Sequence, residues 1–541
     1  MLPTKEQSVI IEETNSCVVI AKPGSGKTFT LSKKIKKILP DLPDFKGVIA
    51  ISYTNKASDE LKHRSLDGGL DKKGSFFGTI DKFFVSEIIL PFGKYVFGNS
   101  KSSVEIFNSR LEQFVQLQDD KRVTSLLEIG YSRLETKHIE WIKNKYHSGI
   151  IFLELIGIMS MYIFDNSIAC KNYLKARYSH IIIDEYQDSG KEQHEMFLRL
   201  KQLGLCAIAV GDGDQSIFGF AKKDSRYLLE LAQIKDRSLK LFSLNKNHRS
   251  HSSIINYSNA FLNSGAILLP EEEIRVFEKR IIGNQFDIAK WIDSNISKIL
   301  NTYGVNNENQ VGILVRGDTT GKILNNNLLT NHKYFQNTPL DNDSNIWSQL
   351  FKEVLNVVFD KNSIKYELVE KYIDINSEPS DAKNALQILN KIKNDVSSTP
   401  LNIQYYEKEL IELATILIPN GENGKSIELL NMVLSNYEYI ISYIPAKSSE
   451  VQIMSIHKSK GLEFDIVFHL DLYQYILPAY KGDIIQDSNL HYVGITRAKK
   501  ALFLIWSTER FNGSGDRKRG IKSDFLVKEN LLQHRKVVVP H

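Results

Sequence analysis

One short stretch near the N-terminus restricts the folds open to this chain more than any other feature. An apolar run at residues 17–21 leads into a glycine-rich loop and then a helical pattern, and the loop with its flanks reads Ala21-Lys22-Pro23-Gly24-Ser25-Gly26-Lys27-Thr28. Between a strand and a helix, backbone N–H groups of such a loop cradle phosphate, and the helix N-terminus adds positive potential. We expect Lys27 to reach the β- and γ-phosphates of a nucleotide and Thr28 to bind Mg²⁺. The usual pattern begins with glycine where this chain has Ala21, so the competing interpretation is a glycine-rich turn with a chance lysine.

A second apolar run ends in two adjacent carboxylates. The run Ile181-Ile182-Ile183 is followed by Asp184-Glu185-Tyr186-Gln187-Asp188. Sheets of α/β proteins bind ligands at the carboxyl ends of their strands. We therefore predict that Asp184 holds Mg²⁺ and that Glu185 orients and deprotonates an attacking water. The alternative is a polar loop without a chemical role.

Two further groups of residues complete a phosphoryl-transfer set. A polar turn follows the apolar run at 205–210, and in it Gln215 could sense a γ-phosphate while Phe220 could stack on a nucleobase. Arg249 and Arg497 lie in the stretches 247–250 and 492–500. Arginine neutralises charge that develops on a γ-phosphate because its guanidinium group is always charged and presents its N–H donors in a rigid fork. Packing for Phe220 and surface positions for the two arginines are the alternatives.

Composition sets the class of protein. The chain has 541 residues, which suggests about three or four domains. Its 42% apolar content and net charge of +5 fit a globular protein, and the charge excess is too small to prove a nucleic-acid partner. The three cysteines form no C-x-x-C pair, which argues against zinc and disulfides. We expect a soluble cytoplasmic protein, because the N-terminus is polar and no apolar run reaches the roughly 20 residues that a bilayer needs.

The order of apolar runs predicts an α/β fold. Runs without strict alternation fit buried parallel strands, and they occur at residues 17–21, 48–53, 180–183, 205–210, 311–315 and 465–470. Two segments between them have helical patterns. We therefore expect two α/β sheets, each interrupted by a helical insertion, followed by a basic tail that forms a surface helix or a loose end.

The motifs occur in the order seen in superfamily 1 helicases, and the chain resembles their UvrD-like branch. The resemblance runs from Gln7 to Lys500. It implies two RecA-like domains with ATP and Mg²⁺ between them. Lys27, Thr28, Asp184, Glu185 and Gln215 would come from the first domain, and Arg249 and Arg497 from the second.

The same resemblance implies the remaining site residues. Gln7 would read adenine, and Glu463 would contact the ribose. Single-stranded DNA would cross both domains, with movement from 3′ to 5′. The residues that would contact it are Thr54, Asn55, Phe220 and His457.

The resemblance also implies the domain boundaries. The first RecA-like domain would comprise residues 1–90 and 176–245, with a helical insertion at 91–175. The second would comprise residues 246–341 and 448–515, with a reduced helical insertion at 342–447. A basic tail at 516–541 would follow.

Several positions depart from the family pattern. Relatives often read Gly-Thr-Phe-His-Ser where this chain has Gly78-Thr79-Ile80-Asp81-Lys82, and Ala221 replaces a frequent arginine. Relatives hold adenine between Arg and Tyr, where this chain has Phe29 and His248. We therefore expect an enzyme that accepts purine nucleoside and deoxynucleoside triphosphates with a modest preference for ATP.

A closer resemblance is to the helicase-like subunit of the Gabija anti-phage system. It is carried by residues 78–92 and by Thr338-Pro339-Leu340-Asp341. It implies nucleotide hydrolysis triggered by DNA ends, and association with an OLD-family nuclease that carries a TOPRIM domain. Two alternatives stay open: a stand-alone repair or replication helicase, and a non-catalytic scaffold that retains the loop.

Overall fold

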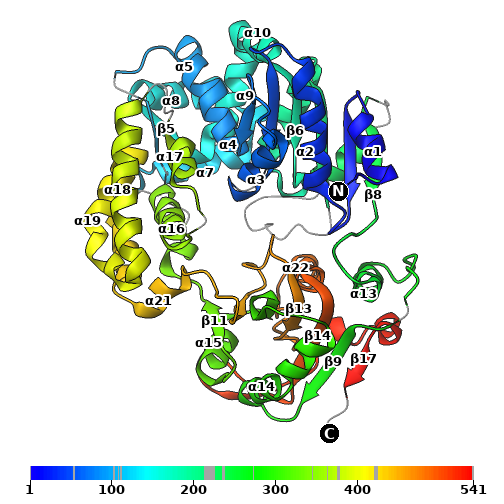
Figure 1. Ribbon diagram of the computed structural model, residues 1–541. Coiled ribbons are helices and arrows are strands. Elements are labelled where there is room, and N and C mark those ends of the chain that lie inside the picture. The colour runs from blue at the N-terminus through cyan, green and yellow to red at the C-terminus, as the bar shows by residue number, and fades with distance from the viewer. Residues whose placement is uncertain are drawn as a thin grey trace. The chain divides into compact units, whose positions relative to one another are not determined.

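Two parallel β-sheets organise the chain (Figure 1). The computed structural model describes residues 2–538 apart from 53–54, 102–103, 108, 110–111, 213–225, 234–237, 272, 344, 362, 374–377 and 420–423. Contacts divide the chain into two units, Met1–Ser250 and His251–His541. The predicted fold class is confirmed, and the six predicted strands are all present within two residues of their expected bounds.

The first unit contains a six-stranded sheet in the order β3-β2-β6-β7-β1-β8. Every neighbouring pair is parallel, so all carboxyl ends lie at one edge. Strands β6, β7 and β1 are adjacent, which brings the loops after them together at that edge. The strands are β1 (Cys17–Ala21), β2 (Gly47–Ile51), β3 (Phe76–Gly78), β6 (Tyr178–Ile183), β7 (Cys206–Gly211) and β8 (Lys240–Leu244).

The first unit has twelve α-helices in its described residues. Helix α2 begins after Gly26 and buries Leu31 and Ile35 in a core shared with β1 and β7. The helices are α1 (Lys5–Glu12), α2 (Lys27–Ile38), α3 (Asn55–Leu66), α4 (Ile80–Phe83), α5 (Leu90–Phe97), α6 (Glu112–Gln116), α7 (Asp119–Ile129), α8 (Thr136–His147), α9 (Ile156–Asn166), α10 (Ile168–Arg177), α11 (Lys191–Gln202) and α12 (Arg226–Ala232). A π-helical turn, Phe84–Ile89, joins α4 to α5.

The segment 91–175 is mostly helical, as expected, but it also holds a small parallel sheet of β4 (Glu105–Phe107) and β5 (Ile150–Phe152). Strands of three residues are too short to show a periodicity in the sequence. No single helix among the described residues is long and apolar enough to cross a membrane. One pair of described helical segments, Leu153–Asn166 and Ile168–Arg177, is together long and apolar enough, but the pair is bent by 98° at its junction.

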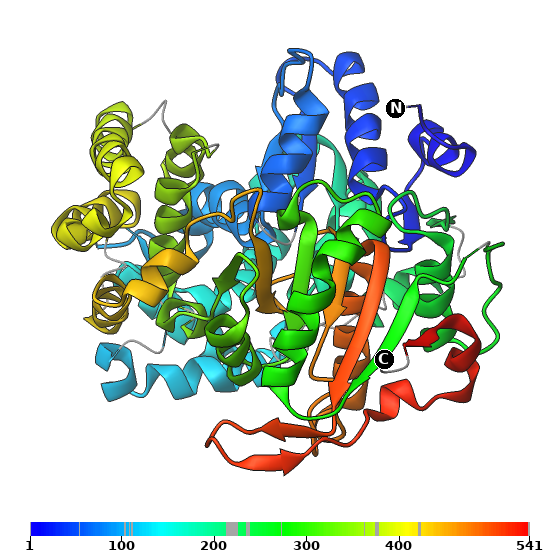
Figure 2. The same ribbon diagram turned by 60° about the horizontal axis from the view of Figure 1, so that its bottom comes forward.

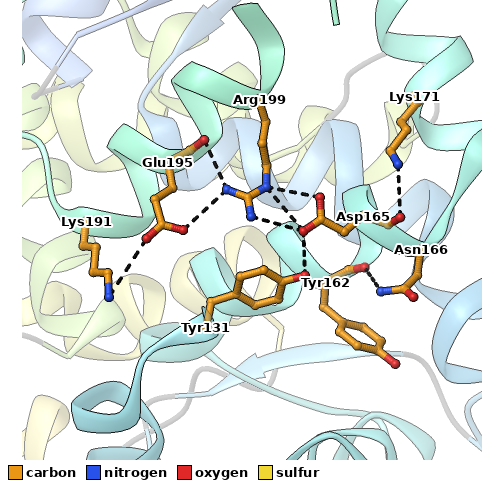
Figure 3. A network of polar contacts seen from close by, with 8 residues as sticks. All are labelled: Tyr131, Tyr162, Asp165, Asn166, Lys171, Lys191, Glu195 and Arg199. Carbon is orange, nitrogen blue, oxygen red and sulfur yellow. Dashed lines mark hydrogen bonds and ion pairs between the residues drawn. The ribbon is translucent and has the colours of Figure 1, made fainter. Parts of the chain in front are cut away.

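A polar network joins this helical segment to α11 (Figure 3). Arg199 on α11 donates from Nη2 to Asp165 Oδ2 at 3.1 Å and from Nε to Asp165 Oδ1 at 3.1 Å. Tyr131 donates its hydroxyl to the same carboxylate at 2.7 Å. The network therefore holds the end of α9 against α11, the helix that follows the acidic pair.

The second unit contains a seven-stranded parallel sheet in the order β11-β12-β10-β13-β14-β9-β17. Strand β10 is buried throughout, as expected for a sheet covered on both faces. The strands are β9 (Val276–Ile281), β10 (Val311–Val315), β11 (His332–Phe335), β12 (Val451–Ser455), β13 (Phe464–His469), β14 (Ala498–Ser507) and β17 (Lys536–Val538).

A helical bundle is inserted between β11 and β12. Its helices α16 to α21 share a core around Trp347, Phe351 and Leu389, and the described part of 342–447 contains no strand. The helices of this unit are α13 (Ser252–Leu262), α14 (Gln285–Thr302), α15 (Asp318–Asn327), α16 (Ile346–Phe359), α17 (Lys365–Tyr372), α18 (Pro379–Ser398), α19 (Glu407–Leu417), α20 (Gly424–Leu434), α21 (Tyr437–Ser442) and α22 (Ile484–Thr496).

In its described residues, 516–538, the C-terminal tail forms neither a surface α-helix nor a loose end, so that expectation was wrong. Figure 2 shows the hairpin of β15 (Glu509–Phe511) and β16 (Arg517–Arg519), in orange-red, extending beyond the strands of the second sheet. The chain then returns, and β17 pairs with β9. Arg535 is buried, with its Nε 2.7 Å from Glu278 Oε2. A buried partner for this cation explains why a basic sequence lies inside the fold.

Candidate nucleotide-hydrolysis site

The loop after β1 has two positions at which backbone conformation and space both favour glycine. Gly24 and Gly26 adopt φ of 69° and 81°, in the left-handed region. A Cβ at Gly24 would lie 2.6 Å from Asn247 Oδ1, and one at Gly26 would lie 2.7 Å from Gln7 Nε2. The two glycines of the predicted pattern are therefore favoured by both conformation and space.

Asn247, which the sequence analysis missed, ties this loop to the segment after β8. Its Nδ2 donates to Pro23 O at 2.9 Å, and its Oδ1 accepts from the N–H groups of Arg249 and Ser250 at 2.7 and 2.9 Å. The N–H of His248 donates to Gly24 O at 2.8 Å. Asparagine often forms such turns with the backbone two residues on, and Asn247 lies two residues before Arg249.

The loop meets the requirements of a phosphate site. The Ser25 side chain is buried, and its Oγ has no hydrogen-bond partner among the described residues. Helix α2 begins at Lys27, so the N–H groups of its first turn point toward the loop. A buried hydroxyl without a partner is costly, and a phosphate oxygen can satisfy it together with these N–H groups.

A hydroxyl and a carboxylate suited to Mg²⁺ lie next to each other. Thr28 Oγ1 donates to Asp184 Oδ2 at 3.2 Å. Asp184 is 3% exposed, and burial together with the neighbouring Glu185 raises the pKa of its carboxyl, although Lys27 opposes the shift. No cluster of three or more His, Cys, Asp or Glu that could hold a metal occurs in the described ranges. This donor set fits Mg²⁺, which binds one or two protein oxygens and completes its shell with phosphates and water.

Lys27 and Glu185 face each other, with Lys27 Nζ 3.5 Å from Glu185 Oε1. Burial lowers the pKa of Lys27, but Glu185, Asp212 and Asp184 more than offset that effect, so its pKa lies above the usual value. Glu185 has a left-handed backbone with φ of 54°. Its Oε2 accepts a hydrogen bond from Gln187, to which the sequence analysis gave no role.

The predicted base-binding residues surround the same loop. Gln7 is buried; its Nε2 donates to Ser25 O at 2.9 Å, and its Oε1 accepts from the N–H of Thr4 at 2.9 Å. One amide hydrogen and one lone pair of Gln7 remain for a base. Phe29 is half-buried on α2 with Lys33 Nζ 5.7 Å from its ring centre, and His248 is exposed.

Arg249 lies next to the boundary between the two units. The resemblance assigned it to the second domain, but contacts divide the chain after Ser250, so Arg249 lies in the first unit. The physical reason is the Asn247 amide, which holds this segment on the loop after β1. Arg249 also lies close enough to Lys27 to lower its pKa.

Most of the other predicted residues lie in the second unit or outside the described residues, and Asn55 lies in the first unit. Arg497 is 3% exposed, and its guanidinium donates to Val493 O at 3.1 Å and Leu462 O at 3.2 Å. Glu463 is exposed after the turn that follows β12. His457 lies in that turn, and burial lowers its pKa to about 4. Asn55 begins α3, while the predictions for Thr54, Gln215 and Phe220 concern residues outside the described ranges.

A glycine loop between strand and helix, with Lys27 and Thr28 beside Asp184 and Glu185 at the carboxyl edge of a parallel sheet, defines a P-loop nucleoside triphosphatase. Two family models agree: an AAA domain matches residues 6–221, and the UvrD-like helicase C-terminal domain matches residues 333–509. The chain therefore carries the domains of a UvrD-like helicase, and it is a helicase-type nucleoside triphosphatase.

Individual relatives are similar over nearly the whole chain. Gabija protein GajB of Bacillus cereus (strain VD045) is 29% identical over 527 residues, which cover 93% of this chain and 95% of the relative. ATP-dependent DNA helicase Rep of Buchnera aphidicola subsp. Schizaphis graminum (strain Sg) is 24% identical over 614 residues, with 91% of each chain covered. A probable DNA helicase II homolog of Mycoplasma genitalium is 23% identical, with 90% and 82% covered.

Proposed function

We propose that this chain is a DNA-stimulated purine nucleoside triphosphatase that moves 3′ to 5′ on single-stranded DNA and serves as the helicase-like subunit of an anti-phage complex. The observation that carries the proposal is the gathering of Lys27, Thr28, Asp184 and Glu185 at one sheet edge. The defence role is supported by the similarity to GajB, which extends over 95% of that protein. The proposed partner is an OLD-family nuclease.

The reaction follows from the site. The loop N–H groups and Lys27 bind the β- and γ-phosphates, and Thr28 and Asp184 hold Mg²⁺. When bound, Mg²⁺ neutralises charge on the phosphate oxygens. Glu185 accepts a proton from a water whose oxygen bonds to the γ-phosphorus. The bond from that phosphorus to the bridging oxygen breaks, and the oxygen leaves with the electron pair as part of the nucleoside diphosphate.

Further cations and a stacking residue complete the proposal. Arg249 and Arg497 neutralise charge on the γ-phosphate, and Gln215 senses its presence. Gln7 and Glu463 bind the base and the ribose. The proposed DNA contacts are Thr54, Asn55, Phe220 and His457.

The second candidate function is a stand-alone DNA repair or replication helicase. It is favoured by the similarity to Rep, which covers 91% of both chains. A repair helicase would act without a nuclease partner and would separate long duplexes. Association with a nuclease and duplex separation are therefore the properties that distinguish the two candidates.

Hydrolysis of the four nucleotides with single-stranded, duplex and nicked DNA tests the catalytic proposal. Lys27→Ala should weaken nucleotide binding and abolish turnover, while Glu185→Gln should bind nucleotide and fail to hydrolyse it. Lys36→Ala is the matched control, because Lys36 lies on the same helix and pairs with Asp67 away from the loop. Near-normal turnover in Glu185→Gln would overturn the assignment of the base.

Co-expression with an OLD-family nuclease from the same gene cluster tests the partner. One co-eluting complex, together with phage protection that needs both chains and is lost in Lys27→Ala, is the expected result. Separate elution at micromolar concentration, with full protection from this chain alone, would overturn the partner assignment. Separation of long duplexes by the isolated chain would favour the repair helicase.

A further inference from the structure

A buried amide lies between the proposed catalytic base and the next strand of the sheet. Gln187 is 0% exposed and lies in the 3-10 turn Tyr186–Asp188 that follows β6. Its Nε2 donates to Glu185 Oε2 at 2.5 Å, and its Oε1 accepts from the N–H of Asp212 at 2.9 Å. One side chain therefore connects Glu185 to the end of β7.

The two oxygens of Glu185 are held by different groups. Oε1 lies 3.5 Å from Lys27 Nζ, and Oε2 accepts from Gln187. Lys27 is the residue proposed to turn toward nucleotide phosphates, and in doing so it would release Oε1. Gln187 does not depend on the phosphates, so its hydrogen bond would remain and keep the carboxylate in place during the reaction.

The backbone around the Gln187 amide has an unfavourable conformation at Glu185 and leaves no room for a side chain at Gly211. Glu185 has φ of 54° and ψ of 43°, a left-handed conformation that is unfavourable for a residue with a side chain. A Cβ at Gly211 would lie 2.5 Å from Gln187 Oε1 and 3.1 Å from the Gln187 backbone nitrogen. The amide therefore fits only because β7 ends in glycine.

We infer that Gln187 is a positioning residue for hydrolysis, whose amide fixes the Glu185 carboxylate against the end of β7. The inference rests on the proposed role of Glu185 as the base. Glutamine suits this task because one end of its amide donates to the carboxylate while the other accepts from the backbone. A glutamate or a methionine of similar size cannot do both.

The first test is the steady-state kinetics of Gln187→Met and Gln187→Glu. Methionine removes both hydrogen bonds, whereas glutamate retains the acceptor for the Asp212 N–H and loses the donor to Glu185. Both variants should lower kcat on the order of 10²-fold, as expected when a reacting group is misplaced by about 1 Å. KM and the affinity for a non-hydrolysable nucleotide with Mg²⁺ should change by less than about threefold, because the phosphate contacts are untouched.

Gln193→Met is the matched control. Gln193 lies in the first turn of α11, the helix that follows the same 3-10 turn. Its Oε1 accepts from the N–H of Gly190, without a hydrogen bond to Glu185 in the described structure. Its kcat should match that of the unsubstituted protein. A similar fall in kcat in this control would show that any loss of packing near the turn has the same effect, and would overturn the inference.

A double-mutant cycle distinguishes positioning from stability. Glu185→Asp shortens the base so that it no longer reaches the amide, and it should retain slow, measurable turnover. In that background Gln187→Met should lower kcat by less than about threefold if Gln187 acts through Glu185. A full loss in both backgrounds would overturn the inference.

The two proposals fail in different ways. Normal kcat in Gln187→Met and Gln187→Glu, with Glu185→Gln inactive, would overturn only the role of Gln187. Normal turnover in Glu185→Gln would instead overturn the assignment of the base on which that role rests.

Discussion

Thr28 Oγ1 donates to Asp184 Oδ2 across 3.2 Å, although 156 positions separate the two residues in the chain. Strand β7 lies between the strands that carry them, because the sheet order is β6-β7-β1. The contact therefore spans the loops that leave two non-adjacent strands. It gives the proposed Mg²⁺ site a hydroxyl and a carboxylate that already face each other.

The Thr28 hydroxyl should determine how much Mg²⁺ the enzyme needs. Thr28→Val keeps the shape of the side chain and removes the oxygen, so half-maximal turnover should require at least about tenfold more Mg²⁺, or ~1.4 kcal/mol. Thr28→Ser retains the hydroxyl and should remain within about threefold of the unsubstituted protein. Titration of turnover with Mg²⁺ measures this, and identical curves for Thr28→Val and Thr28→Ser would contradict the site.

Arg497 should affect both rate and stability. Its guanidinium donates to Val493 O, which also accepts from the Thr496 hydroxyl, and to Leu462 O. Arg497→Ala therefore removes two hydrogen bonds and should lower the free energy of unfolding of its unit by about 1–3 kcal/mol. Arg497→Lys should fold better, yet still lose on the order of 10³-fold in kcat as arginine fingers do. Denaturant unfolding and turnover of both variants check this. A folded Arg497→Lys with normal kcat would show a purely structural residue.

Asp341 should make the stability of the second unit dependent on pH. Burial raises the pKa of its carboxyl, and Lys458 and Lys352 more than offset that effect, which brings the pKa to about 2. Because the folded pKa lies below the unfolded value, the carboxylate stabilises the fold above about pH 4, by roughly 2 kcal/mol, and this contribution is lost as pH falls toward 2. The difference in unfolding free energy between the unsubstituted protein and Asp341→Asn should therefore shrink from pH 6 to pH 2.5. A constant difference would contradict this role.

Phe220 should influence DNA rather than nucleotide. Stacking on a base contributes about 1–3 kcal/mol, so Phe220→Ala should raise the DNA concentration that half-maximally stimulates turnover by about fivefold or more. Turnover without DNA should stay the same. Titration with a single strand at fixed salt measures the effect. Unchanged DNA affinity would assign Phe220 to packing.

Base selectivity should be modest. The Gln7 amide already donates to Ser25 O and accepts from the N–H of Thr4. The side chain near the loop is the aromatic ring of Phe29, where relatives have arginine. An aromatic ring stacks on either purine, so ATP and dATP should be preferred over GTP and dGTP by less than about a hundredfold in kcat/KM, or ~2.7 kcal/mol. Steady-state kinetics with the four purine nucleotides check this. A preference above about a thousandfold would show an intact adenine pocket.

Local sequence was sufficient to predict six of the strands and the chemical groups at the ends of β1 and β6. The apolar run at β1 and the two glycines after it specify a phosphate loop, because glycine adopts the left-handed backbone found at Gly24 and Gly26 without steric cost. Asp184 and Glu185 follow a buried strand in the same way. These are short-range signals, and the structure has the predicted strands within two residues of their expected bounds.

Only the tertiary structure decided which residues, distant in the chain, form hydrogen bonds and ion pairs with one another. Gln187 bridges to Asp212, Asn247 holds Pro23, and Arg535 pairs with Glu278, each across tens or hundreds of positions. The hydrophobic periodicity of the sequence does not predict such pairs, because they depend on strand order and on where a loop returns to the sheet. The basic tail shows the same limit: its composition favours an exposed segment, yet β17 completes the second sheet because β9 supplies both an open edge and the buried carboxylate of Glu278.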